Sequence, residues 1–142
     1  MADTSILDAK RAVERVLKGT NLTTPIAYEN VKFDPPTSGM YITCQFQIQR
    51  PTDPVFGAGY HRENVEFQVF VVDDINSASG TTAGFTRALQ IRNTFKKGTT
   101  FQEGNTRIHI LETPQVAGSM QLNNKIWYPI LIPLLVEVDS TL

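Results

Sequence analysis

The side chains most often used in catalysis and metal binding are few in this sequence, and their spacing matches no common site. His61 and His109 have no metal-ligand spacing with Cys44 or with any carboxylate. His109 lies between two isoleucines of an expected strand, so we expect it on the opposite, water-facing side. Cys44 falls on the apolar side of another alternating segment, where a thiol packs as a small core residue. The pattern therefore predicts no metal site and no cofactor.

The adjacent carboxylates Asp73 and Asp74 make a poor acid–base pair. Neighbouring residues of a strand point to opposite faces of a sheet, so we interpret the two carboxylates as the end of a strand. The sequence contains no GxSxG, HExxH or dinucleotide-binding pattern. The glycines of segment 51–64 lack the spacing and the following helix of a phosphate-binding loop. Nothing in these residues supports an enzyme.

Length and composition indicate one globular domain over residues 1–142. The 142 residues are 41% hydrophobic and 19% charged, and the net charge of −1 lacks the basic excess of a dedicated nucleic-acid binder. Cys44 is the only cysteine, so no intramolecular disulfide can form. The N-terminal segment is charged from its third residue and has no apolar core like that of a signal peptide. We expect a soluble protein made inside the cell.

Two segments have the apolar spacing of amphipathic helices. The first covers residues 5–18 and is followed by Gly19; the second develops within residues 75–98 and stops at Gly98. The apolar stripes comprise Ile6, Ala9, Val13, Val16 and Leu17 in the first helix, and Phe85, Ala88, Leu89 and Phe95, with Arg92 in phase, in the second.

Strands are expected at 40–50, 65–74 and 106–113, with a short one near 25–28. In 40–50 apolar residues alternate with threonine and glutamine, which indicates one wet face. Segment 114–125 is expected to be a long loop. The order helix, strands, helix, strands favours an α+β fold, with an antiparallel or mixed β-sheet and two helices packed on one face.

Segment 51–64 also has the composition of a long loop, yet it carries apolar side chains. Its glycines and prolines exclude regular structure, while Phe56 and Tyr60 need cover from water. Either the loop folds back on the domain or a partner covers its tip. Together with Arg50 and Arg62, these two rings form one candidate partner surface.

The most apolar segment, 126–138, contains two prolines, Pro129 and Pro133. Its even positions are apolar and suit a core under the helices, and its odd positions include Trp127, Leu131 and Leu135. Both prolines have odd numbers, so both missing amides lie on one side of the strand. We therefore expect an edge strand, or one whose outer partner is interrupted. The odd apolar stripe is either an interface or covered by loop 115–125.

The order of these segments resembles the tail terminator (tail completion) proteins of long-tailed bacteriophages. The resemblance starts at "YENVKFDPP" and continues through "FGAGYHRENVEFQVFVV", "FKKGTTF", "TRIHI" and "WYPILIPLLVEV", almost the whole chain. It implies a small α+β domain that forms a hexameric ring in the tail–neck region of the virion. Such a ring caps the growing tail tube, stops its polymerisation and offers a surface to the head connector.

The partners implied are further copies of the chain, the tail tube protein and a head–neck connector protein. DNA would pass through the ring without specific binding, consistent with the modest net charge. The expected surfaces are the loop-rich side described above and a helical side with Arg11, Arg15, Arg92, Lys96 and Lys97. Two alternatives stay open: another neck component, and a small-ligand binder or enzyme with a concave sheet under two helices.

Overall fold

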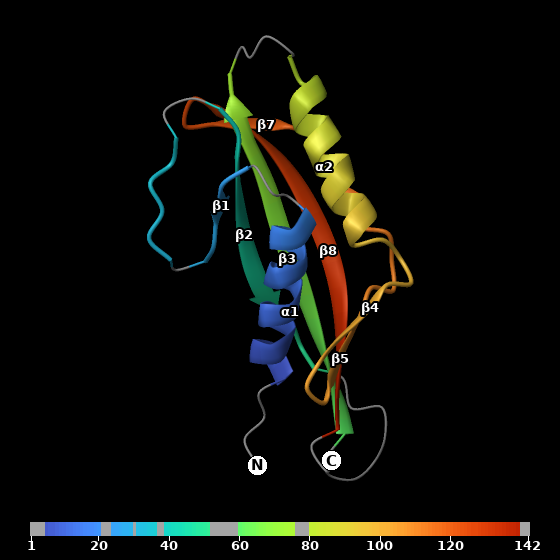
Figure 1. The fold of residues 1–142 in the computed structure, drawn as a ribbon. Helices are drawn as coiled ribbons and strands as arrows, with labels where there is room; N and C mark the ends of the chain where they lie inside the picture. The colour runs from blue at the N-terminus through green and yellow to red at the C-terminus, as the bar shows by residue number, and fades with distance from the viewer. Residues whose placement is uncertain are drawn as a thin grey trace.

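The computed structural model is an α+β domain in which two helices cover one face of an eight-stranded mixed sheet (Figure 1). It describes residues 5–20, 24–29, 31–36, 39–51, 60–75 and 80–139. The elements are α1 (Ser5–Thr20), β1 (Ile26–Ala27), β2 (Tyr41–Ile48), β3 (Tyr60–Asp74), α2 (Thr82–Thr94), β4 (Thr100–Glu103), β5 (Thr106–His109), β6 (Gln115–Val116), β7 (Met120–Leu122) and β8 (Lys125–Asp139). The predicted fold class is confirmed.

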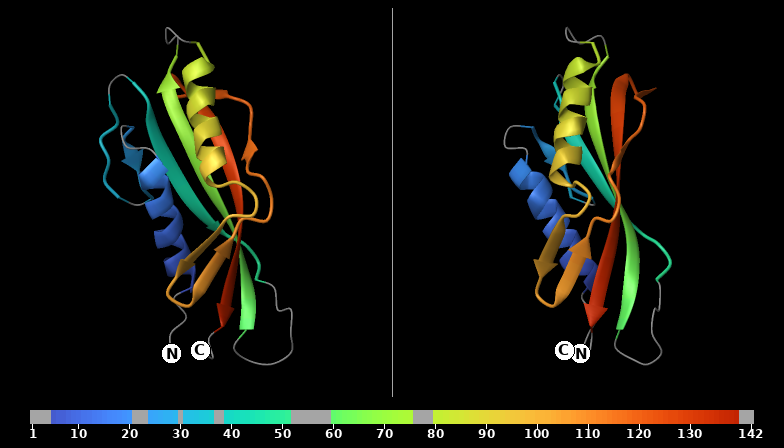
Figure 2. Two further views of the ribbon diagram at one scale, coloured as in Figure 1. Left: turned by 45° about the vertical axis from the view of Figure 1, so that its right-hand side comes forward. Right: turned by 90° about the vertical axis from the view of Figure 1, so that its right-hand side faces the viewer.

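The sheet has the order β1-β2-β3-β8-β5-β4, and β6 and β7 also pair with β8. Only the pairing of β1 with β2 is parallel; every other pairing in the described residues is antiparallel. Both helices lie on the same side of the strongly twisted sheet, and no helix of the described residues lies on the opposite side (Figure 2). We call this second side the open face.

Both helices form where their apolar spacing predicts. On α1, Ala9, Val13 and Leu17 are fully buried, as the predicted stripe requires. On α2 the buried residues are Gly84, Ala88 and Ile91, whereas the predicted core residue Leu89 is 41% exposed. That assignment was wrong because the buried stripe of α2 runs through Gly84, Ala88 and Ile91, and Leu89 lies beside it.

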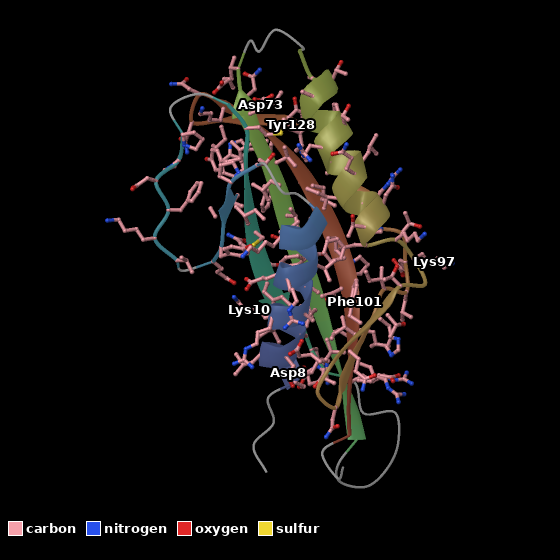
Figure 3. The ribbon with its side chains drawn as sticks, viewed as in Figure 1. Asp8, Lys10, Asp73, Lys97, Phe101 and Tyr128 are labelled. Carbon is pink, nitrogen blue, oxygen red and sulfur yellow. The ribbon has the colours of Figure 1, made fainter. Side chains whose placement is uncertain are left out.

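The first turn of α2 lies unusually close to the sheet. A Cβ atom added at Gly84 would lie 2.1 Å from Cε2 of Tyr128, a fully buried residue of β8 (Figure 3). The ring of Phe85 packs edge-on against the same tyrosine, with centroids 4.9 Å apart. Glycine therefore lets this helix turn rest directly on the tyrosine ring.

The centre of the sheet is the pair β3–β8, which is in register along all 15 residues of each strand. The prediction that residues 60–64 belong to a loop was wrong, because β3 begins at Tyr60. These residues pair with 135–139 of β8, and the Asn64 carbonyl also accepts the Gln49 amide at 2.8 Å. Pairing with a strand far along the chain thus overrides the turn-rich local composition.

The two prolines of β8 lie where its second ladder is broken. The Pro129 carbonyl accepts the Ala117 amide at 3.0 Å, so its ring nitrogen also points to the side of β6. Pro129 lies between the β7 and β6 pairings, and Pro133 lies between those of β6 and β5. Thus β8 is not an edge strand, and the alternative of an interrupted outer partner is confirmed.

The segment between α2 and β8 is more regular than its composition predicts. β4 was not predicted, and β6 and β7 lie inside the expected loop 114–125. Each has four residues or fewer, too short for a clear alternation of apolar and polar positions. β6 and β7 form on the outer edge of the long β8, and β4 forms by pairing with β5. Neither helix of the described residues has the length and apolarity of a membrane span.

Candidate interaction surface

The open face is built mainly from the odd positions of β8 and their neighbours. Even positions from Tyr128 to Val136 are buried under the helices, whereas Trp127, Leu131 and Leu135 point to the open face and are half-buried. The predicted division of the strand into a core face and an outer apolar face is therefore confirmed. Residues paired across the sheet share a face, so the register defines the rest of the surface.

The upper end of the open face is apolar. The Trp127 indole packs edge-on against Phe70 of β3, with ring centroids 5.8 Å apart, and its Nε1 donates to the Leu122 carbonyl at 3.2 Å. Met120, the register partner of Trp127, is 46% exposed, and Leu122 is 51% exposed. The β7 segment therefore extends the apolar surface sideways instead of covering it, so the alternative that loop 115–125 covers the stripe is wrong at this end.

The middle of the open face is polar on both sides of Leu131. Its register partners are Gln68 on β3 and Gln115 on β6. The Gln68 side chain donates to Gln47 Oε1 at 3.1 Å and to Glu66 Oε1 at 2.7 Å. Leu131 is thus one apolar side chain among amides and a carboxylate, and hydrogen bonds connect Gln68 with Gln47 and Glu66.

The lower end of the open face is charged. Glu137 lies with Oε1 3.7 Å from Arg62 Nε and with Oε2 3.3 Å from His109 Nε2. The other ring nitrogen of His109 lies 3.1 Å from Thr100 Oγ1. His109 therefore points to the open face, as predicted, and this cluster joins four strands: β3, β8, β5 and β4. Leu135, the register partner of His109, borders it.

A small hollow marks the gap between the β6 and β5 pairings. Its volume is about 150 Å³, and Leu111 beside it is 57% exposed. The residues that line it are Asn64, Leu111, Glu112, Pro133, Leu134 and Leu135. The interruption imposed by Pro133 thus leaves an apolar recess next to the lower part of the open face.

The predicted loop-side residues are only partly brought together. Arg62 lies on β3 within the charged cluster. The backbone carbonyl of the exposed Arg50 accepts a hydrogen bond from the side-chain amide of Asn64 at 2.9 Å. Tyr60 is the first residue of β3 and not a loop residue. Phe56 lies outside the described residues. Arg62 of β3 and Leu135 of β8 thus both lie at the charged cluster, while Trp127 and Leu131 lie further along β8.

The predicted basic residues of the helical side are spread over α1, α2 and the turn that follows α2. Arg15 forms an ion pair with Glu103 at 2.9 Å, and Arg11 lies 3.8 Å from Asp8. Lys96 and Lys97 are exposed in the turn after α2, and Lys97 lies on its outer side (Figure 3). Arg92 of α2 is half-buried. These five residues form no single cluster, and two of them are already paired.

The remaining candidate groups, the Cys44 thiol and the Asp74 carboxylate, have surroundings that fit structural residues. Cys44 is buried, and burial raises the pKa of its thiol to about 12, so the thiol stays protonated at neutral pH. The pKa of the Asp74 carboxyl is lowered by the Gly39 amide at 2.7 Å and by Lys125 at 2.6 Å. Among the described residues, no cluster of three or more metal-ligating side chains exists.

Sequence reasoning missed Met120 and Leu122 as members of the surface. The turn between β7 and β8 is formed by Asn123 and Asn124, with φ of 54° and 60°. Two consecutive residues with positive φ are typical of a two-residue hairpin, and asparagine favours that conformation. The dipeptide was therefore a usable sign that the preceding residues form a strand.

Comparison with known proteins identifies relatives of the fold. A family model described as phage tail terminator protein matches residues 8–134. One solved structure that carries no functional name aligns with a TM-score of 0.68 at 20% identity, covering 96% of each chain. A chain of the virion of a native gene transfer agent particle aligns with a TM-score of 0.64 at 13% identity, covering 96% of this chain and 99% of the other. No curated protein sequence matches.

Proposed function

Because this chain belongs to the phage tail terminator family, we propose that copies of it form a ring, of six subunits, that caps the tail tube. The family is one of structural proteins of the phage tail, which assigns the chain to the virion. In the proposed role, the ring binds the end of the tube, stops polymerisation and provides the surface for head joining. Its partners are the tail tube protein and a head–neck connector protein, and DNA passes through without specific binding.

The observation that carries the proposal is the open face. On this side of the sheet, Trp127 and the exposed Met120 and Leu122 form an apolar end that no helix or strand of the described residues covers, and the half-buried Leu131 and Leu135 lie further along β8. Surfaces of this kind mark protein interfaces. The similarity of fold to a chain of a gene transfer agent virion is consistent with assembly into a particle.

A cap must also present two different surfaces. If the far end of the ring repeated the surface of the tube end, it would bind a further tube subunit, and head-to-tail contact would continue into a filament. The subunit offers two unlike ends: the charged cluster around Glu137 and Arg62, and the apolar end around Trp127. Two unlike ends are consistent with a cap that binds the tube at one end and a different partner at the other.

Assembly in solution tests the interface. A ring of six predicts a mass of about 95 kDa, six times the 15.9 kDa of one chain, in size-exclusion chromatography with light scattering. Leu131→Asp should give a folded monomer, because the side chain lies half-buried on the open face. Leu89→Asp is the matched control, since Leu89 is 41% exposed on α2, on the other side of the sheet. Unfolding of Leu131→Asp would show that the residue belongs to the core.

The function is tested in phage assembly. Removal of the chain should give tails of uncontrolled length that fail to join heads. Complementation with the wild-type chain or with Leu89→Asp should restore normal tails, and Leu131→Asp should not. Tails of normal length, joined to heads, in the absence of the chain would contradict the terminator role and favour another neck component.

A further inference from the structure

The segment that contains α2 and the turn after it carries positive charge without any carboxylate. Residues 75–102 include Arg87, Arg92, Lys96 and Lys97 but no aspartate or glutamate, in a chain whose net charge is −1. The rest of the chain therefore carries a net charge of −5. A modest total charge thus conceals one basic element, which we call the α2 cations after its four side chains.

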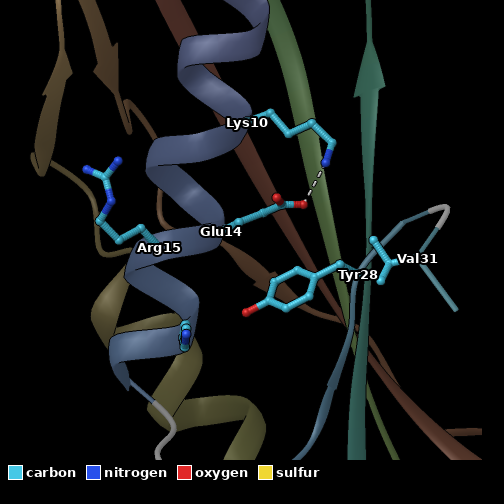
Figure 4. Close-up of a pocket in the computed structure, with 6 residues that line it drawn as sticks. Lys10, Glu14, Arg15, Tyr28 and Val31 are labelled. Atoms are coloured by element: carbon cyan, nitrogen blue, oxygen red, sulfur yellow. Dashed lines mark hydrogen bonds and ion pairs between the residues drawn. The ribbon is translucent and has the colours of Figure 1, made fainter. Parts of the chain in front are cut away.

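None of the α2 cations is neutralised by an acidic neighbour. Arg87 donates to Gln90 Oε1 at 3.0 Å, and none of the four forms an ion pair with a described residue. On α1, by contrast, Lys10 pairs with Glu14 at 2.8 Å (Figure 4). The dipole of α2 favours cations at its end, which applies to Arg92 but not to Arg87 in the middle of the helix.

The surface around the α2 cations is polar and uncharged. Arg87 and Arg92 flank the buried stripe of α2 on opposite sides, and the exposed Lys96 and Lys97 follow the helix, with Lys97 on its outer side (Figure 3). The exposed residues of α2 itself are Thr82, Thr86, Leu89, Gln90 and Asn93. Leu89 is the one large apolar side chain among them.

This chemistry suits a phosphate backbone better than a protein surface. Protein–protein interfaces have apolar centres and are depleted in lysine. Contacts to DNA phosphates come from arginine and lysine and from the neutral side chains of threonine, asparagine and glutamine, and they need no apolar anchor. The α2 surface has both kinds of donor and no acidic group that would repel a phosphate.

We propose that the α2 cations bind the phosphate backbone of duplex DNA without reading its sequence. Four phosphate contacts give weak, salt-sensitive binding, so the DNA stays free to move along the surface. The place of this contact in the virion rests on the proposed function, in which DNA passes through the ring. Binding by the isolated chain does not depend on that role.

Fluorescence anisotropy with a labelled duplex of about 20 base pairs tests the proposal. Four phosphate contacts predict a slope of log K against log salt of about −3.6 for each subunit in contact, which is a loss of about 150-fold in affinity between about 50 and 200 mM salt. A second duplex of unrelated sequence should bind with the same Kd, because no base edge is read.

A matched pair of lysine variants localises the contact. Lys97→Gln should reduce the slope to about −2.7, and Lys96→Gln with Lys97→Gln should reduce it to about −1.8 and raise the Kd at least about tenfold at low salt. Lys32→Gln is the control, because Lys32 is an equally exposed lysine outside α2 and loses the same charge. It should leave the slope unchanged. Circular dichroism should show all three proteins folded, since these lysines are exposed.

Three results would overturn the inference. Absence of binding at low salt would exclude the site, and equal losses in Lys32→Gln and Lys97→Gln would show an effect of net charge alone. Polyglutamate that binds as tightly as DNA, and loses affinity in the same variants, would assign the surface to an acidic protein. Normal tail termination by a chain that binds no DNA would contradict this inference alone. DNA binding by a chain whose removal leaves tails normal would contradict the terminator role alone.

Discussion

Substitution of Gly84 by alanine tests the contact between α2 and the sheet. The added methyl group would lie 2.1 Å from Cε2 and 2.2 Å from Cζ of Tyr128. Carbon atoms pack at roughly 3.5–4.0 Å, so the helix or the ring must move by about 1.4 Å. Tyr128 is fully buried between α2 and its neighbours, so the ring has little room to move. The strain therefore has to be taken up by the core.

The net effect is the difference between two opposing contributions. Overpacking of a core costs about 1–3 kcal/mol, and the size of this overlap suggests the upper end of that range. Alanine in a helix is about 1 kcal/mol more favourable than glycine. We therefore expect Gly84→Ala to lower the free energy of unfolding by about 2 kcal/mol. For a chain of this size that corresponds to a fall in Tm of roughly 4–8 °C.

The assay is thermal and urea unfolding, followed by circular dichroism at equal protein concentration. Gly19→Ala in α1 is the matched control, because no atom lies within 4 Å of the added methyl group, and it should raise Tm slightly. In the background Tyr128→Leu, which lacks the overlapping ring atoms, Gly84→Ala should no longer destabilise. If Gly84→Ala alone raises Tm as Gly19→Ala does, the close approach of α2 to Tyr128 is refuted.

Three further predictions concern reactivity, pH and the β7–β8 turn. With a pKa of about 12, Cys44 should react with iodoacetamide at pH 8 on the order of a thousandfold more slowly in the folded protein than in urea. The pKa of Asp74 is lowered by Gly39 and Lys125, so its stabilising contribution is complete above its unfolded pKa of about 3.9 and is lost as pH falls through the folded value. The variant Asp74→Asn should therefore lose less stability than the wild type on acidification below about pH 4, and parallel acid-unfolding curves would contradict this. Asn124 has a φ of 60°, so Asn124→Gly should raise the free energy of unfolding by a few tenths to about 1 kcal/mol. A lower free energy of unfolding, measured by urea unfolding, would contradict the turn geometry.

The helices and the long strands could be predicted from the sequence because each depends on a local pattern. The period of the α1 stripe and the alternation in β2 both appear in the structure. The paired prolines of β8 were informative as well, since their common parity predicted on which side the ladder would fail. The division of β8 into a buried even face and an outer odd face followed from the same alternation.

The remaining elements depend on contacts that no local pattern contains. Residues 60–64 have turn-rich neighbours but are held extended by pairing with residues 135–139 of β8. The strands β4, β6 and β7 are short, and each is held extended by the strand with which it pairs: β5 for β4, and β8 for β6 and β7. Glu29 gave no sign that its side chain accepts the Phe46 amide, because this bond depends on how β1 is placed against β2. The same limit hid the approach of Gly84 to Tyr128.

The order of the strands along the chain has a consequence for biosynthesis. β8 is translated after every other strand of the sheet, yet it is the partner of β3, β5, β6 and β7. Until β8 leaves the ribosome, one edge of β3 is unpaired, and the core between the sheet and the helices lacks the apolar side chains of β8. Such non-local pairing gives a high contact order, which slows folding and prolongs the exposure of aggregation-prone edges. Nascent chains that stall before residue 125 should therefore need chaperone binding, and complete subunits should become competent for assembly only after β8 has entered the sheet.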